Sequence, residues 1–215
     1  MQVPFRERLF PGWTWRLPAE SKCIAVTFDD GPDPQTTPLL LRQLDRLQIP
    51  STMFILGERV AHNVSLLNEC ISAGHTLALH GQTHESFFWH SAHWQENSIR
   101  TIESTMTSCG LTFQRLFRPP FGHFNLATSS VLKRLKYRGT LWSHIVSDWR
   151  NQSAVQLESR LCHGLHSGGI LLLHDAKPTT RTVVDALPRL ADEVSRRGWR
   201  FVTLAHFTTP QRTSQ

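Results

Sequence analysis

The sequence predicts one α/β domain, built either on a parallel sheet or as an α/β barrel. Segments with the length and apolar character of buried strands alternate with segments of helical periodicity along almost the whole chain, which is the pattern of parallel sheets. The 215 residues are enough for one substantial core but few for two. With 40% hydrophobic and 19% charged residues, the composition is that of a folded chain and excludes an intrinsically disordered one.

The expected strands are short apolar runs bounded by glycine, proline or polar turn residues. They are Cys23 to Asp29, Ser51 to Leu56, Thr76 to His80, Leu116 to Arg118, Thr140 to Val146, Gly169 to His174, and Trp199 to Leu204. The spacing of apolar residues predicts helices over Pro38 to Gln48 and over Val60 to Ala73. Gly74 and Gly198 follow helical segments and are expected to be C-caps.

The domain is expected to span residues 21–207, with an N-terminal extension over residues 1–20 and a frayed tail over residues 208–215. The segment Met1 to Ala19 lacks the apolar run of a signal peptide. No transmembrane segment is expected, because no run of about eighteen apolar residues occurs. As given, the chain is expected to be cytoplasmic, or to belong to the envelope or be secreted if it has been trimmed. No motif indicates an oligomeric state.

The charge of the chain does not point to a nucleic-acid partner. The 23 Lys and Arg residues outnumber the 17 Asp and Glu residues, which gives a formal charge of +6 and allows weak attraction to polyanions. The basic pairs Lys133-Arg134 and Arg196-Arg197 lie in helical segments, where a solvated face explains them. We therefore expect no specific nucleic-acid binding.

Reactive side chains recur at the carboxyl ends of the predicted strands. These residues are Asp29 and Asp30, His80, Arg118, Asp148, and His174. Catalytic groups of α/β barrels gather at this face, because the carboxyl ends of parallel strands meet there. A chance scatter of core-filling residues would not produce this placement, so the sequence predicts an active site at these strand ends.

Two motifs predict a divalent metal site. Asp29 ends the first expected strand and Asp30 follows it, and His80 ends the third with His84 just beyond. The ordinary alternatives are a structural turn for the two carboxylates and a chance pair among the 12 histidines of the chain. Adjacent carboxylates repel each other unless a cation or a shared proton relieves the repulsion. One carboxylate with two imidazoles is a donor set of hydrolytic zinc sites. We therefore expect Asp30, His80 and His84 to bind the metal and Asp29 to remain ionised as a candidate base.

Three further segments fit an active site, although each has a structural alternative. The loop Arg118-Pro119-Pro120-Phe121-Gly122 could be merely a rigid connection. Because its prolines lack amide protons, however, the Phe121 amide is one of the few that could bind a ligand. Arg118 would then face Asp29 and orient it. Asp148 could be an ordinary helix N-cap, and His174 a satisfied core histidine. Their joint placement at strand ends favours the functional interpretation.

Together these segments resemble the NodB-homology polysaccharide deacetylases, carbohydrate esterase family 4. Five motifs of that family occur here in order. The motif T-F-D-D-G is matched by Thr27 to Gly31, H-[ST]-x-x-H by His80 with His84, and R-x-P-[YF]-G by Arg118 to Gly122. The motif D-x-x-D-W is matched by Asp148 with Trp149, and L-x-x-H by Leu171 with His174. The resemblance spans roughly Cys23 to Leu204 and implies a distorted (β/α)7 barrel. Two positions depart from the motifs: Gly81 replaces the usual Ser or Thr, and Ile145 replaces a common first Asp.

The resemblance implies a metal-dependent hydrolase that removes N-acetyl groups from an amino-sugar glycan of the chitin or peptidoglycan type. Asp29 is then the catalytic base, with Arg118 beside it. The metal ligands are Asp30, His80 and His84, with Zn²⁺ as the first expectation and Co²⁺ or Ni²⁺ as alternatives. The partner is a glycan substrate.

The remaining motif residues complete the implied mechanism. His174 is the catalytic acid, and Asp148 is expected to raise its pKa. The Phe121 amide stabilises the oxyanion. Trp142 and Leu171 are expected to enclose the acyl methyl group.

Other functions fit the same residues. An O-acetyl glycan esterase or an amino-sugar deformylase would use a similar site, and an ester would depend less on an acid. A non-catalytic glycan-binding relative would keep the fold, although it would need none of Asp29, Arg118 and His174. The stretch Phe87 to Trp94, rich in aromatic residues and histidine, either stacks on sugar rings or covers the barrel edge.

Overall fold

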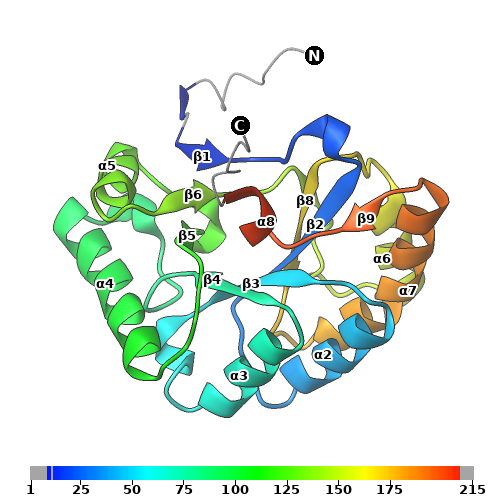
Figure 1. Ribbon diagram of the computed structural model, residues 1–215, viewed down its shortest axis with the longest axis horizontal. Coiled ribbons are helices and arrows are strands. Elements are labelled where there is room, and N and C mark those ends of the chain that lie inside the picture. Colours follow the sequence, from blue (N-terminus) through cyan, green and yellow to red (C-terminus); the bar gives the residue numbers. More distant parts are fainter. Residues whose placement is uncertain (1–8, 11, 209–215) are drawn as a thin grey trace, which may run out of the picture.

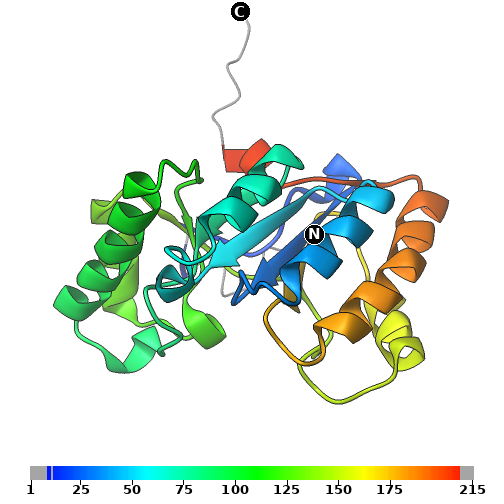
Figure 2. The ribbon, with the colours of Figure 1, turned by 90° about the horizontal axis from the view of Figure 1, so that it is seen from below.

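The computed structural model describes residues 9, 10 and 12–208, so residues 209–215 of the tail expected to fray lie outside the described part. The strands are β1 (Trp13–Thr14), β2 (Cys23–Asp29), β3 (Ser51–Ile55), β4 (Thr76–Leu79), β5 (Leu116–Phe117), β6 (Arg138–Thr140), β7 (His144–Ile145), β8 (Gly169–His174) and β9 (Arg200–Phe201). The helices are α2 (Thr37–Arg46), α3 (Val64–Ser72), α4 (Ala92–Ser108), α5 (Leu126–Arg134), α6 (Ala154–Cys162), α7 (Thr180–Arg196) and α8 (Ala205–Thr208). Helices α2 to α7 lie around the outside of the sheet (Figures 1 and 2).

The strands pair in parallel, as the alternation of strands and helices predicts. Their order in the sheet is β1-β6-β5-β4-β3-β2-β8-β7, and β9 also pairs with β2. Strand β2 is buried along its whole length and contacts both β3 and β8. The register between β2 and β8 places Asp29 opposite His174. The residues expected to be base and acid therefore start from neighbouring strand ends.

The segment that holds β6 and β7 connects opposite sides of the sheet. One strand was expected over Thr140 to Val146, but the structure has two short strands, β6 beside β5 and β7 beside β8. Between them, the Leu141 amide donates to the Thr14 carbonyl at 2.8 Å and the Ser143 amide donates to the Ile170 carbonyl at 3.1 Å. The chain changes its partner within a few residues, which interrupts the strand and bends the sheet into a distorted barrel.

Part of the expected N-terminal extension is built into this barrel. Trp13 of β1 pairs with Gly139 of β6 and is only 6% exposed. Its indole Nε1 donates to the Ser129 hydroxyl at 3.0 Å, and its ring stacks on Phe124 at 4.1 Å. These contacts tie β1 to both β6 and α5.

Residues along the strands alternate between two apolar clusters. Leu171 and Leu173 belong to the larger cluster, which also contains buried residues of helices α2 to α7. Ile170 belongs to a smaller cluster with Ala25 and Phe54. Because successive side chains of a strand point to opposite faces, the larger cluster fills the layer between sheet and helices and the smaller one fills the inner face.

The helix boundaries are close to those expected. The helix expected from Val60 begins at Val64, because Gly57–Arg59 forms a 3₁₀ turn before it. Gly74 and Gly198 have φ of 83° and 65° directly after α3 and α7, which confirms them as C-cap glycines. No helix in the described part of the chain combines the length and apolar character that a bilayer span requires.

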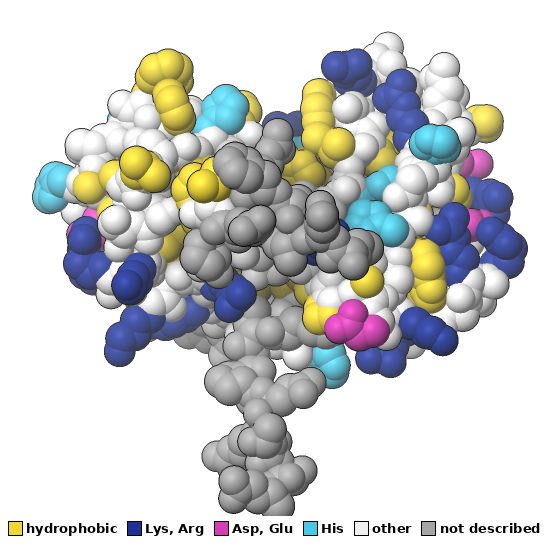
Figure 3. All heavy atoms as spheres, turned by 90° about the horizontal axis from the view of Figure 1, so that it is seen from above, with side chains coloured by type: hydrophobic (Ala, Val, Ile, Leu, Met, Phe, Trp, Pro, Cys, Tyr) yellow, Lys and Arg dark blue, Asp and Glu magenta, His cyan; other side chains and the backbone are white. Residues whose placement is uncertain are grey.

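Basic side chains do not form a continuous tract on the face seen in Figure 3. On that face, Lys and Arg side chains lie in several separate groups between uncharged and hydrophobic ones.

The packing of β1 on β6 can be tested at Gly139. A Cβ atom added there would overlap the Trp13 ring, so we expect Gly139→Ala to lower the free energy of unfolding by about 1–3 kcal/mol in urea titrations. Gly12→Ala is the control, because its Cβ meets nothing within 4 Å, and we expect a change within about 0.5 kcal/mol. Equal stability of the two variants would contradict the described packing.

Candidate active site

The reactive residues surround one cavity at the carboxyl ends of the strands. Its volume is about 510 Å³, and it is lined by Asp29, Asp30, His80, His84, Phe121, Trp142, Ile145, Trp149, Leu172, His174 and Lys177. Asp29 and His174 are the last residues of β2 and β8, and the other polar residues follow strand ends. The fold therefore brings together side chains that are up to 148 positions apart, between Asp29 and Lys177.

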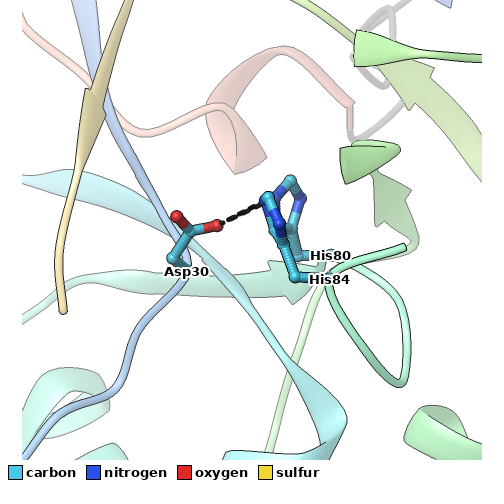
Figure 4. A group of neighbouring side chains, drawn as sticks. All are labelled: Asp30, His80 and His84. Carbon is cyan, nitrogen blue, oxygen red and sulfur yellow. Dashed lines mark ion pairs between the residues drawn. The ribbon is translucent and has the colours of Figure 1, made fainter. Parts of the chain in front are cut away.

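Asp30, His80 and His84 form a candidate metal site (Figure 4). Their ligand atoms all lie within 4.8 Å of one another. The Oδ1 atom of Asp30 is 3.3 Å from Nε2 of His80 and 3.1 Å from Nε2 of His84, and Figure 4 shows both rings on the side of this oxygen. A carboxylate oxygen and two imidazole nitrogens suit Zn²⁺ and similar divalent ions, and three protein ligands leave positions open for water or substrate.

Contacts behind the ligands fix their orientation. The Arg118 carbonyl lies 2.8 Å from Nδ1 of His80. A carbonyl only accepts, so Nδ1 carries a proton, and Nε2 is the nitrogen that faces Asp30 and that a metal would use. On the other side, Nζ of Lys177 forms an ion pair with Oδ2 of Asp30 at 2.6 Å. Lys177 was not among the residues predicted from the sequence, where its only signal is its position shortly after the end of β8.

Asp30 has a strained backbone and a stabilised negative charge. Its φ of 74° lies in the left-handed region, which aspartate tolerates better than most residues. Burial alone would raise the pKa of Asp30, but hydrogen bonds and charge interactions with His80 and His84 outweigh it and hold the pKa well below its usual value. The side chain is therefore an ionised ligand already placed before the imidazoles.

Asp29 is held by a buried arginine. Nη1 of Arg118 donates to Oδ1 of Asp29 at 2.6 Å and to the Thr27 hydroxyl at 2.8 Å. The arginine side chain is fully buried and packs over the Phe54 ring at 4.0 Å. Oδ2 of Asp29 lies 3.8 Å from Nε2 of His80 and so faces the metal site. One oxygen of Asp29 is thus fixed by Arg118, and the other is directed toward the cavity.

His174 and Asp148 form the second polar pair of the cavity. Asp148 is buried and accepts twice from His174, from Nδ1 at 2.9 Å and from the backbone amide at 2.7 Å. Burial alone would lower the pKa of His174, but the hydrogen bond and charge of Asp148, followed by the charges of Asp29 and Asp30, raise it above its usual value. Trp149 lies edge-on to the imidazole at 5.1 Å.

The loop after β5 contains a backbone amide without a hydrogen-bond partner in the described part of the chain, that of the cavity residue Phe121. Phe121 has φ of 59°, and the following amides of Gly122 and His123 donate to the carbonyls of Pro119 and Pro120. Among the described residues, no hydrogen bond uses the Phe121 amide. Gly122 also allows close approach, because a Cβ there would lie 2.6 Å from the Trp142 ring.

The expectation that Leu171 encloses the acyl group is corrected by the structure. Leu171 is fully buried in the cluster shared with the helices, whereas Leu172 lines the cavity. The reason is the period of two along a strand, which puts Leu172 on the same face of β8 as His174. Trp142 does line the cavity, as expected.

The two departures from the family motifs have different structural settings. Gly81 has φ of 99°, and a Cβ there would lie 3.2 Å from the Thr83 carbonyl, so this conformation favours glycine. The loop is braced instead by Ser98 of α4, whose hydroxyl accepts from the Gln82 amide at 3.0 Å. Ile145 is 51% exposed and contributes an apolar side chain to the cavity wall.

Comparison with known proteins identifies the family. The polysaccharide deacetylase family model matches residues 16–140. A peptidoglycan-N-acetylglucosamine deacetylase of Bacillus cereus is 32% identical over 200 residues, covering 89% of this chain and 91% of the relative. A chitooligosaccharide deacetylase of Bradyrhizobium is 27% identical over 172 residues, covering 79% of this chain and 78% of the relative.

The fold is shared with a solved deacetylase. The crystal structure of the Bc1960 peptidoglycan N-acetylglucosamine deacetylase superposes with a TM-score of 0.89 at 24% identity, covering 95% of this chain and 96% of the other. The matched range of residues contains Asp30, His80 and His84 as well as the Asp29–Arg118 pair. The chain therefore belongs to the polysaccharide deacetylase family, whose NodB-homology motifs it carries.

Proposed function

We propose that this protein is a metal-dependent hydrolase that removes N-acetyl groups from a glycan containing N-acetylglucosamine. The observation that carries the proposal is the arrangement of three groups around one cavity: a metal-ligand cluster, an arginine-held carboxylate, and a carboxylate-held histidine. The related enzymes named as N-acetylglucosamine and chitooligosaccharide deacetylases support this reaction class.

Asp30, His80 and His84 would hold the metal, for which we propose Zn²⁺, with Co²⁺ or Ni²⁺ as alternatives. A bound divalent ion supplies Lewis-acid chemistry, because it polarises an acyl oxygen and lowers the pKa of a water ligand toward about 7. Lys177 and the Arg118 carbonyl keep the carboxylate and the His80 imidazole in position for this role.

Asp29 acts as the base. Water attacks the acyl carbon of the acetamide, and the water proton passes to Oδ2 of Asp29, since Oδ1 is held by Arg118. The acyl oxygen becomes an oxyanion, and the free Phe121 amide donates a hydrogen bond to it. A donor of this type contributes about 3–4 kcal/mol to the stability of the transition state.

His174 acts as the acid. The carbon–nitrogen bond breaks with its electron pair going to nitrogen, and an amine leaves poorly unless it is protonated. Nε2 of His174 donates this proton, because Nδ1 is bound to Asp148. Acetate and the free amino sugar are the products, and Leu172 and Trp142 form the apolar wall beside the acetyl methyl.

The proposal is tested by acetate release from N-acetylglucosamine oligomers, peptidoglycan and acetylxylan, with and without EDTA. We expect release from the N-acetylated substrates, a loss of at least about 10²-fold after EDTA treatment, and recovery on addition of Zn²⁺. Release from acetylxylan alone would instead identify an O-acetyl esterase. Glycan binding without any release would identify a non-catalytic relative.

The role of His174 predicts a pH dependence. Because His174 must be protonated and its pKa is raised, activity is retained above the usual histidine pKa and lost as pH rises through the raised value. We expect Asp148→Asn to lower kcat/KM about 10²-fold and to move the alkaline limb of its pH profile to lower pH. Asp192→Asn, at an exposed position of α7, is the control. An unmoved alkaline limb in Asp148→Asn would contradict the pairing.

A further inference from the structure

Two exposed aromatic side chains lie in the chain segment that follows His84 of the candidate active site. Phe88 is 48% exposed and Trp89 is 80% exposed. Their rings pack edge to face at 4.8 Å with an interplanar angle of 85°. Both belong to the 3₁₀ turn Phe87–Trp89, which follows the metal-ligand His84. Adjacent exposed aromatic rings beside a catalytic cavity often mark a ligand-binding surface.

The turn is held rigidly although its outer rings are exposed. Phe87 is fully buried and packs on Phe117 at 4.9 Å. The Gln95 side chain donates to the Phe87 carbonyl at 2.8 Å, and the Asn125 side chain donates to the Phe88 carbonyl at 2.9 Å. The stretch thus has two parts, because Phe87 covers the barrel edge while the next two rings face solvent in a fixed position.

A series of ring contacts connects the metal site with this turn. The Phe121 ring packs edge-on to His84 at 4.3 Å and lies 5.5 Å from His123. The His123 ring in turn bonds through Nδ1 to the Ser86 hydroxyl at 3.2 Å, directly before the turn. Ser86, directly before the turn, is therefore linked through His123 and Phe121 to His84, which lines the cavity.

We propose that Phe88 and Trp89 bind the sugar units next to the one being deacetylated, so that the enzyme favours long chains over short ones. This inference rests on the proposed function. The C–H faces of pyranose rings are apolar and carry small positive charge, which complements the negative face of an aromatic ring. A ring pair fixed in advance loses little entropy when it binds the sugar.

The small area and the neighbouring charge of the Phe88–Trp89 pair favour a glycan over a protein or a lipid surface. At most about 250 Å² is available from each ring, which is less than the roughly 800 Å² per partner of a stable protein interface. The charged neighbour in the loop is Glu85, which bonds to Thr83 and lies 3.5 Å from His90. An acidic neighbour disfavours docking on an anionic lipid surface.

The test is the preference for chain length. Acetate release is measured with the β-1,4-linked N-acetylglucosamine dimer and hexamer, and the ratio of the two kcat/KM values is compared between variants. We expect Trp89→Ala to lower the hexamer-to-dimer ratio about tenfold, mainly through KM, and Trp89→Phe to restore most of it. Val155→Ala, at another exposed apolar position on α6, should leave the ratio unchanged.

The outcomes separate this inference from the proposed function. If the wild-type protein releases no acetate from either oligomer, the proposed function fails. If it is active but Trp89→Ala keeps the wild-type ratio, the assignment of Phe88 and Trp89 to glycan binding is wrong. An unchanged ratio together with loss of binding to phosphatidylglycerol vesicles, or with loss of a dimer in analytical ultracentrifugation, would assign the rings to lipid or to a second copy and overturn the proposal.

Discussion

The buried ion pair between Arg118 and Asp29 is the interaction on which the rest of the site depends. The guanidinium is fully buried, and Asp29 is almost so. Removing one partner of such a pair costs about 3–5 kcal/mol, because the other charge is left uncompensated. Nη2 of the same arginine donates to the Leu141 carbonyl at 3.1 Å, and its backbone carbonyl orients His80. One residue thus connects the proposed base, a metal ligand and the segment that bends the barrel.

This connection gives two adjacent carboxylates, Asp29 and Asp30, different surroundings. Arg118 takes an oxygen of Asp29, whereas Asp30 is turned by its positive φ toward the two imidazoles and Lys177. Two neighbouring negative charges would repel each other if both faced the same cavity without cations. The register of β2 with β8 then places His174 beside Asp29, so the proposed base and the proposed acid lie at the ends of adjacent strands.

The sequence was sufficient to predict the parallel fold and most of the polar residues that meet around the cavity, because both are visible as local signals. Apolar strands ending in Asp29 or His174 mark the carboxyl face without reference to distant residues. Contacts made across the fold could not be predicted in this way. Lys177 reaches Asp30 from a loop far along the chain, and the split of the strand expected over Thr140 to Val146 arises where the chain changes its pairing partner.

Two other differences come from side-chain direction rather than from chain position. The family motif led to the prediction that Leu171 lines the cavity, but the face of β8 that borders the cavity carries Leu172. Likewise, composition alone gave the aromatic stretch after His84 two equal interpretations. The structure separates them, because Phe87 is buried and Trp89 is exposed.

The central claim is that Asp29 moves a proton while Asp30 holds the metal, and Asp29→Asn tests it most directly. The bound metal of purified protein and its acetate release are measured together, with His80→Ala as the comparison. We expect Asp29→Asn to keep its metal and lose about 10²–10⁴-fold in turnover, and His80→Ala to lose both. Full turnover in Asp29→Asn, or loss of its metal, would contradict the separate roles.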